Sequence, residues 1–129
     1  MIISYKYKIY HDSKHKEDLH DLCRASAFVW NRALALQRKY YKIYGKYIDV
    51  NKLQKHFTKR INKQYEFLSI MNSQSIQEII QRLDNSYKRF FKKIQKRPPK
   101  FKSHRSFSSF VFKQCGYKID GNILYINKL

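Results

Sequence analysis

The stretch that decides the fold runs from residue 72 to residue 112 and reads NSQSIQEIIQRLDNSYKRFFKKIQKRPPKFKSHRSFSSFVF. Apolar residues recur at three- and four-residue steps from Ile76 to Ile94, which predicts an amphipathic helix. The helix should end before Pro98, because proline lacks an amide proton and disfavours helical backbone in the residue before it. Asn72 or Ser73 can cap its start, and a second possibility is the capping-box spacing of Ser75 and Glu78.

The second half of this stretch is basic and aromatic, and it contains no acid. No Asp or Glu occurs between Asn85 and Ile119. Lysine and arginine neutralise phosphates, and exposed aromatic rings stack on bases, so this half favours nucleic-acid binding. Phe101 and Phe107 could be stacking or core residues, whereas Phe110 and Phe112 fit a strand core better. The expected phosphate-binding residues are Lys88, Arg89, Lys92, Lys93, Lys96, Arg97, Lys100, Lys102 and Arg105.

The chain before this stretch begins with a strand pattern and continues with helical ones. Ile3, Tyr5, Tyr7 and Ile9 alternate with polar residues, which predicts a strand over residues 2–10. A stripe from Leu19 to Tyr41 then predicts one or two helices over about 13–44, ended by Gly45. A shorter helix with Leu53, Phe57 and Ile61 inward and five cations outward should follow, and then an apolar connector over 65–71.

The chain after this stretch returns to strand patterns. Residues 107–113 are a strand candidate, and residues 117–126 form a predicted hairpin with Asp120-Gly121 in the turn. The fold class is therefore α+β, with a small β-barrel or sheet interrupted after its first strand by an inserted helical bundle. The expected organisation is a first strand over 1–12, a helical insertion over 13–97 and the remaining strands over 98–129.

Composition favours one globular domain that binds a polyanion. The chain has 129 residues, of which 43% are hydrophobic, and a formal net charge of +19. Such a charge points to nucleic acid first and to a membrane surface second. The N-terminus lacks the apolar run of a signal peptide, and two cysteines are too few for a disulfide scaffold, so we expect a reducing cytoplasm.

The sequence predicts neither a metal site nor catalysis. His11, His15, His20 and Cys23 lie close in sequence, but a zinc site needs three or four converging ligands, and no second cluster exists. The nine acidic residues are scattered, whereas two-metal cleavage needs several carboxylates around its ions. There is no Gly-rich phosphate loop and no serine elbow motif. We therefore expect no enzyme activity and no cofactor.

Four motifs resemble the N-terminal part of the TnpB family in their order and spacing. Insertion sequences encode this family, whose members have long been described as transposases with a helix-turn-helix. The resemblance continues to the end of the chain at residues 122–129. The motifs are Phe28-Val-Trp-Asn-Arg-Ala-Leu34, Asn72-Ser-Gln-Ser-Ile-Gln77, Tyr87-Lys-Arg-Phe-Phe91 and Pro99-Lys-Phe-Lys102.

The resemblance implies a wedge-shaped β-barrel split by a helical recognition insertion, within an RNA-guided DNA endonuclease. Protein would read a short flanking DNA motif, and base pairing with RNA would read the rest. The family's motif-reading positions correspond to Ser73, Gln74 and Gln77, and glutamine can pair bidentately with adenine. A strand near Lys113 would approach the same DNA.

The resemblance also implies that the chain ends before the last barrel strand and the nuclease domain. We therefore expect a truncated, non-catalytic, nucleic-acid-binding module, with DNA or transposon-derived RNA as its partner. Two alternatives stay open: an interaction subunit that completes a separately encoded nuclease half, and a non-catalytic regulator of the element.

Overall fold

The computed structural model describes residues 2–107 and 117–126. The longest helix among these residues is α1 (Ser13–Tyr44). The carboxylate of Asp12 caps the helix by accepting a hydrogen bond from the amide of His15 at 2.9 Å. That backbone bond holds the pKa of Asp12 below its usual value. Gly45 ends the helix in the left-handed conformation, with φ at 65°. The two helical patterns over 13–44 are thus one continuous helix, and the predicted stop at Gly45 is confirmed.

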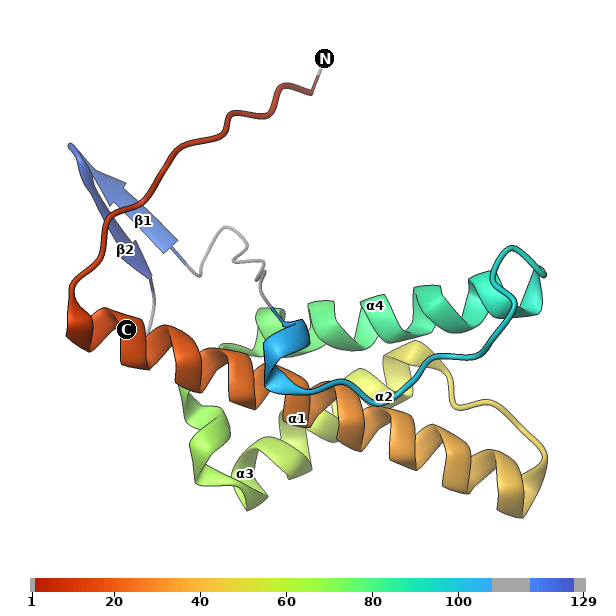
Figure 1. Cartoon of the computed structure of the whole chain (residues 1–129). Coiled ribbons are helices and arrows are strands. Elements are labelled where there is room, and N and C mark those ends of the chain that lie inside the picture. The colour runs from red at the N-terminus through yellow and green to blue at the C-terminus, as the bar shows by residue number, and fades with distance from the viewer. Residues whose placement is uncertain (1, 108–116, 127–129) are drawn as a thin grey trace.

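Helix α4 (Ser73–Phe91) packs along α1 (Figure 1). Asn72 caps it, because its side-chain oxygen accepts a hydrogen bond from the amide of Ser75 at 2.8 Å. Ser75 is buried within the first turn and does not act as the N-cap, so the predicted capping box is not formed. The side chains of Ile76, Ile79, Ile80 and Leu83 are buried as the stripe predicts.

The segment between these two helices closes the other side of the core. It contains α2 (Val50–His56), a π-helical turn η1 (Phe57–Ile61), α3 (Asn62–Gln64) and a 3-10 turn η2 (Glu66–Ile70). Leu53, Phe57 and Ile61 are buried, as predicted. Leu68 and Met71 are also buried, which confirms that the connector packs across the helices. The five cations predicted to face outward are all exposed: Lys52, Lys55, Lys59, Arg60 and Lys63.

Two strands, β1 (Tyr117–Asp120) and β2 (Ile123–Ile126), form the antiparallel hairpin that the sequence predicts. Asp120 pairs with Ile123, so the loop is Gly121-Asn122 and not Asp120-Gly121. Gly121 has φ at 60°, and the first loop position of a type I′ or II′ turn requires a positive value. The described residues therefore show an α+β fold with one two-stranded sheet, and the predicted barrel is not seen in them.

The predicted strand over residues 2–10 is wrong for the structure as described. These residues are exposed, and none is in a strand. A period-two pattern needs a hydrogen-bonded neighbour to become a strand, and residues 2–10 have no ladder partner among the residues described. Of the strand candidate 107–113, only Phe107 is described; it is buried outside any strand.

No helix in the described part of the chain is long and apolar enough to cross a membrane.

Helix α4 ends at Phe91, which is seven residues before Pro98. The amides of Lys93 and Ile94 turn back to the carbonyls of Phe90 and Arg89, both at 3.0 Å. This pair of bonds is a Schellman motif, which needs a left-handed residue that is usually glycine. Lys93 occupies that position with φ at 60°, the one positive value outside glycine among the described residues.

We predict that Lys93→Gly raises the free energy of unfolding by about 0.5–1 kcal/mol, because glycine adopts a positive φ without the steric cost that a Cβ imposes. Thermal unfolding should show a rise of a few degrees in Tm. Lys92→Gly is the matched control: it removes the same charge one residue earlier, where φ is −81°, and should not stabilise. Equal effects of the two substitutions would contradict the prediction.

Candidate nucleic-acid interface

After α4 the chain turns back and lies against α1 from Pro99 to Phe107 (Figure 1). This return segment, residues 99–107, includes a short 3-10 turn, η3 (His104–Ser106). The Trp30 indole Nε1 donates a hydrogen bond to the carbonyl of Lys100 at 2.8 Å, and Arg38 donates to the carbonyl of Pro99 at 3.2 Å. Side chains of α1 thus hold the backbone of the return segment.

Asn31 makes the most specific of these contacts. Its Nδ2 donates to the carbonyl of Lys102 at 2.7 Å, and its Oδ1 accepts from the amide of Lys102 at 2.8 Å. One amide side chain therefore satisfies both backbone groups of one residue, as a neighbouring strand would. Because the bonds use the backbone alone, the Lys102 side chain stays available.

Two cations on this surface lie over the faces of aromatic rings. Lys102 Nζ lies 4.2 Å from the Trp30 ring centroid, and the Arg38 guanidinium lies 4.6 Å from that of Phe101. A cation held over a ring face gains up to about 1 kcal/mol at an exposed site. The Phe107 ring meets Trp30 edge to face at 6.0 Å and is buried, so Phe107 is a core residue. Phe101 is 51% exposed and remains available for stacking.

A hollow of about 340 Å³ opens beside this surface. Trp30, Pro98 and Pro99 form its apolar side, and Arg97, Lys100 and Lys102 bring three cations to it. Gln95 lies in the same lining and donates a hydrogen bond to the carbonyl of Arg97 at 2.6 Å. Cations around a partly apolar hollow suit an anion attached to a ring, such as the phosphate and sugar of a nucleotide.

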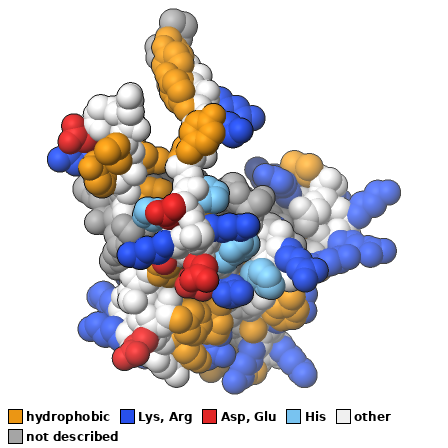
Figure 2. Space-filling model, turned by 60° about the vertical axis from the view of Figure 1, so that its left-hand side comes forward, with side chains coloured by type: hydrophobic (Ala, Val, Ile, Leu, Met, Phe, Trp, Pro, Cys, Tyr) orange, Lys and Arg blue, Asp and Glu red, His pale blue; other side chains and the backbone are white. Residues whose placement is uncertain are grey.

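The structure leaves most of the predicted phosphate-binding side chains exposed. Lys and Arg side chains project over much of the face in Figure 2, and the acidic side chains on it are fewer. Lys113, a further predicted contact, lies outside the described residues. The exposed cations of the predicted site are Lys88, Arg89, Lys92, Lys93, Lys96, Arg97, Lys100, Lys102 and Arg105.

Lys88 differs from the rest because a carboxylate already pairs with it. Its Nζ lies 3.0 Å from Oδ2 of Asp84, which is buried, and the Tyr47 hydroxyl donates to the other carboxylate oxygen at 2.7 Å. Burial, with the Asp84 carboxylate adding to it, raises the pKa of Tyr47 far above its ordinary value, so the phenol stays protonated. Lys88 is therefore a weaker candidate for a phosphate than its neighbours.

The predicted base-reading residues lie at the other end of α4. Ser73 is exposed, and Gln74 and Gln77 are half-buried. The Gln74 side-chain oxygen is buried without a hydrogen-bond partner among the described residues, whereas the Gln77 backbone carbonyl accepts from Gln54 at 3.0 Å. A 19-residue helix is about 28 Å long at about 1.5 Å per residue, so these side chains are far from the cations at its C-terminal end. The return segment runs back towards them (Figure 1).

Trp30, Asn31 and Arg38 were not predicted as functional positions, because in the sequence they fit a helix or a family motif. One signal was available: Asn31 is a polar residue beside a buried tryptophan in the middle of an apolar stripe. Its partner lies 71 residues further along the chain, so no local pattern could have identified it.

The histidine and cysteine residues form no metal centre in the part of the chain that the structure describes. No three His, Cys, Asp or Glu side chains converge there. His15 Nδ1 instead lies 2.7 Å from the Asp12 carboxylate, and burial raises the pKa of the Cys23 thiol. A raised pKa keeps the thiol protonated at neutral pH and makes it a poor ligand and nucleophile.

Comparison with known proteins agrees with the motifs. Residues 1–46 match the helix-turn-helix domain family HTH_OrfB_IS605. Over 118 residues the chain is 28% identical to "Putative RNA-guided DNA endonuclease InsQ" of Escherichia coli K12, an alignment that covers 91% of this chain and 29% of that protein. The resemblance to the N-terminal portion of the TnpB family is thus confirmed, and the chain spans less than a third of the length of this curated relative.

We predict that Asn31→Ala releases the return segment from α1. The Lys102 amide should then exchange with solvent at least about ten-fold faster, because its acceptor is lost and the opening costs about 1.4 kcal/mol less. Hydrogen exchange read by NMR or mass spectrometry measures this. Arg32→Ala, an exposed neighbour on α1, should change nothing. Unchanged exchange in Asn31→Ala would contradict the prediction.

Proposed function

We propose that these 129 residues are the nucleic-acid-binding module of a TnpB-like, RNA-guided DNA-recognition system. The observation that carries this is the return segment: its backbone is held by Trp30, Asn31 and Arg38 while its lysine and arginine side chains remain exposed. The helix-turn-helix match and the similarity to InsQ support the same proposal.

The first step of the proposal is phosphate binding. Arg97, Lys100 and Lys102 line the hollow beside Trp30, and no Asp or Glu occurs in the sequence between Asn85 and Ile119 to compete with phosphates. A backbone held in place lowers the entropy cost of ordering these side chains on a ligand. DNA or a transposon-derived RNA would release counterions from this surface, which makes binding salt-dependent.

The second step is base readout by Ser73, Gln74 and Gln77. Ser73 and Gln77 are four residues apart and therefore share a face of α4. Gln74 is half-buried and its side-chain oxygen has no hydrogen-bond partner among the described residues, so its amide would turn outward to pair with a base. In this proposal the first turns of α4 read a short DNA motif while the return segment holds phosphates, and Lys113 contacts the same DNA.

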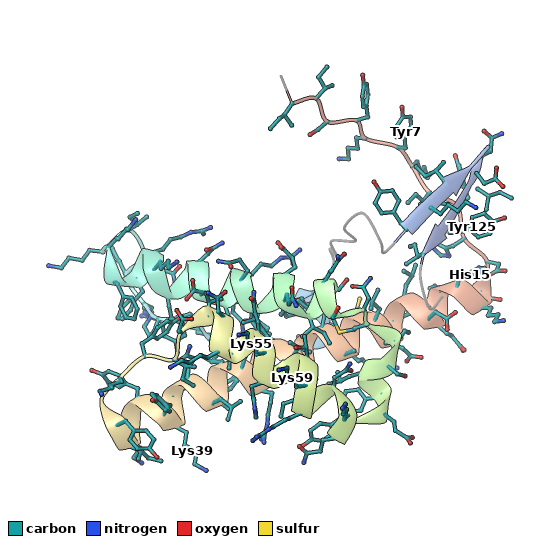
Figure 3. All side chains as sticks on the ribbon, turned by 180° about the vertical axis from the view of Figure 1, so that it is seen from behind. Tyr7, His15, Lys39, Lys55, Lys59 and Tyr125 are labelled. Carbon is teal, nitrogen blue, oxygen red and sulfur yellow. The ribbon has the colours of Figure 1, made fainter. Side chains whose placement is uncertain are left out.

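The third part of the proposal concerns architecture. Residues 13–97 would be the helical insertion, and residues 1–12 and 98–129 would form a wedge-like barrel once residues 2–10, which lie outside any strand in the structure, gain a neighbouring strand. Two features support this arrangement: residues 3–9 alternate apolar and polar side chains, and one face of the hairpin consists of Tyr117, Ile119, Leu124 and Ile126. The N-terminal segment and the hairpin lie at the same end of α1, where Tyr7 and Tyr125 are labelled in Figure 3.

A second candidate function is an interaction subunit that completes a separately encoded nuclease half, and a non-catalytic regulator is a related possibility. The apolar face of the hairpin favours it, because Ile119 is 65% exposed and Tyr117 is 47% exposed. Such an exposed apolar face suits packing against a partner protein. Ile119→Lys should then prevent co-purification with a TnpB-like nuclease portion; the absence of any complex with the unmodified chain would count against this candidate.

We predict that replacing Lys96, Arg97, Lys100 and Arg105 with glutamine weakens nucleic-acid binding and flattens its salt dependence. For each cation that binds a phosphate, its replacement should reduce the slope of log K against log salt by about 0.9 on duplex and about 0.7 on a single strand. Titrations at several salt concentrations measure both quantities. Replacing Lys6, Lys8, Lys14 and Lys16, which are also exposed, removes the same charge and should leave the slope nearly unchanged.

The same assay separates readout from electrostatics. Gln77→Ala should reduce the preference among DNA sequences by about 1–3 kcal/mol while the salt slope stays the same. Its backbone bond to Gln54 does not depend on the side chain, so the fold should persist. Absence of binding by the unmodified chain, even at low salt, would refute the proposed function.

A further inference from the structure

The end of α1 carries a second basic and aromatic surface that the proposed function does not use. Residues 38–47 read RKYYKIYGKY, and every one except Ile43 and Gly45 is a cation or a tyrosine. No Asp or Glu occurs in the sequence between Asp21 and Asp49. We call residues 39–46 the tyrosine end.

The tyrosine end extends beyond the hydrophobic core. The last buried residue of α1 is Gln37, whose side-chain amide exchanges two hydrogen bonds with the backbone of Ile48, at 2.9 and 3.0 Å. The sequence stripe placed Tyr41 in the core, but Tyr41 is 65% exposed and Tyr44 is 63% exposed. These two rings therefore contribute little to the stability of the fold and can meet a ligand.

The rings are arranged as neighbours and not as isolated side chains. The centroids of Tyr40 and Tyr44 are 4.7 Å apart. Beyond Gly45, Tyr47 packs against Tyr87 and Phe91 at 5.2 and 5.6 Å, which connects this end of α1 to the end of α4. Figures 1 and 3 show both helix ends on the same side of the molecule, and Lys39 extends outward there.

We propose that the tyrosine end stacks on unpaired bases of single-stranded nucleic acid, an inference that rests on the proposed function and adds a second contact surface to it. Exposed aromatic faces bind bases of any sequence, and lysines beside them hold the connecting phosphates. A duplex hides its base faces within its own stack, so rings at a helix end gain most from a strand that is unpaired. Lys39, Lys42 and Lys46 supply the cations.

Charge selects this occupant over a second copy of the chain. Two chains with a net charge of +19 repel each other, and the tyrosine end contains only cations among its charged residues. An anionic membrane would also attract it, but tyrosines and a single isoleucine give little apolar surface to insert. Binding to anionic vesicles distinguishes the membrane from the nucleic acid.

The test compares Tyr41→Ala/Tyr44→Ala with the unmodified chain by fluorescence anisotropy, on an oligothymidine of about 20 nucleotides and a duplex of about 20 base pairs, which exceed the site size of one small module. We expect the affinity for the single strand to fall about five- to ten-fold for each tyrosine removed, while the affinity for the duplex changes less than about two-fold. The salt slope should not change, because no cation is removed. Tyr41→Phe/Tyr44→Phe keeps both ring faces and should bind like the unmodified chain.

Controls make the outcomes decisive. Tyr5→Ala/Tyr7→Ala removes two other exposed tyrosines that lie beside lysines, and it should leave single-strand binding unchanged. Circular dichroism checks that each variant keeps its helices. Equal single-strand affinity in Tyr41→Ala/Tyr44→Ala and the unmodified chain would overturn the inference, as would an equal loss on duplex, an equal loss in the control, or a loss confined to binding of phosphatidylserine vesicles. If the unmodified chain binds neither oligonucleotide, the proposed function fails first.

Discussion

Two hydrogen bonds between the Asn31 side chain and the backbone of Lys102, one donated at 2.7 Å and one accepted at 2.8 Å, set the course of the chain after the last helix. Residues 88–105 contain nine cations and no acid, so mutual repulsion favours a segment that swings away into solvent. The amide of Asn31 and the indole of Trp30 oppose this, because they bond to the backbone and leave the charges in water. The cations are thereby kept in one place without being neutralised.

The acid nearest to this surface in the sequence is already paired. That acid is Asp84; it is buried, and it is occupied by Tyr47 and Lys88. A buried carboxylate needs such partners, because an unpaired one costs several kcal/mol. The pair fixes the loop after α1 to α4, and it removes Lys88 from the set of free cations. The Tyr47 ring completes the connection by packing on Tyr87 and Phe91.

The sequence predicted both helices correctly, but the predicted buried stripes extend further towards the C-terminal ends than the packing does. The stripe of α1 is buried from Leu22 to Gln37, and that of α4 from Ile76 to Leu83. Tyr41, Phe91 and Ile94 continue the same spacing and yet are exposed, because the opposing helices no longer cover them. Periodicity shows which side of a helix is apolar; it does not show where the packing partner stops. The strand predicted over residues 2–10 did not form for a similar reason. Alternation shows which side of a strand is apolar, but it does not show which neighbouring strand would pair with it.

The amino-acid sequence by itself determined the charge of the surface, the helical character of 13–44 and 73–91, the stop at Gly45 and the hairpin at 117–126. Each of these follows from composition or from residues within a few positions of one another. Tertiary structure alone decided that Asn31 and Trp30 hold the segment 71 and 70 residues away, that Lys88 is paired, and that Tyr41 and Tyr44 lie in solvent. Those outcomes depend on which distant surfaces meet, and local spacing carries no record of a distant partner.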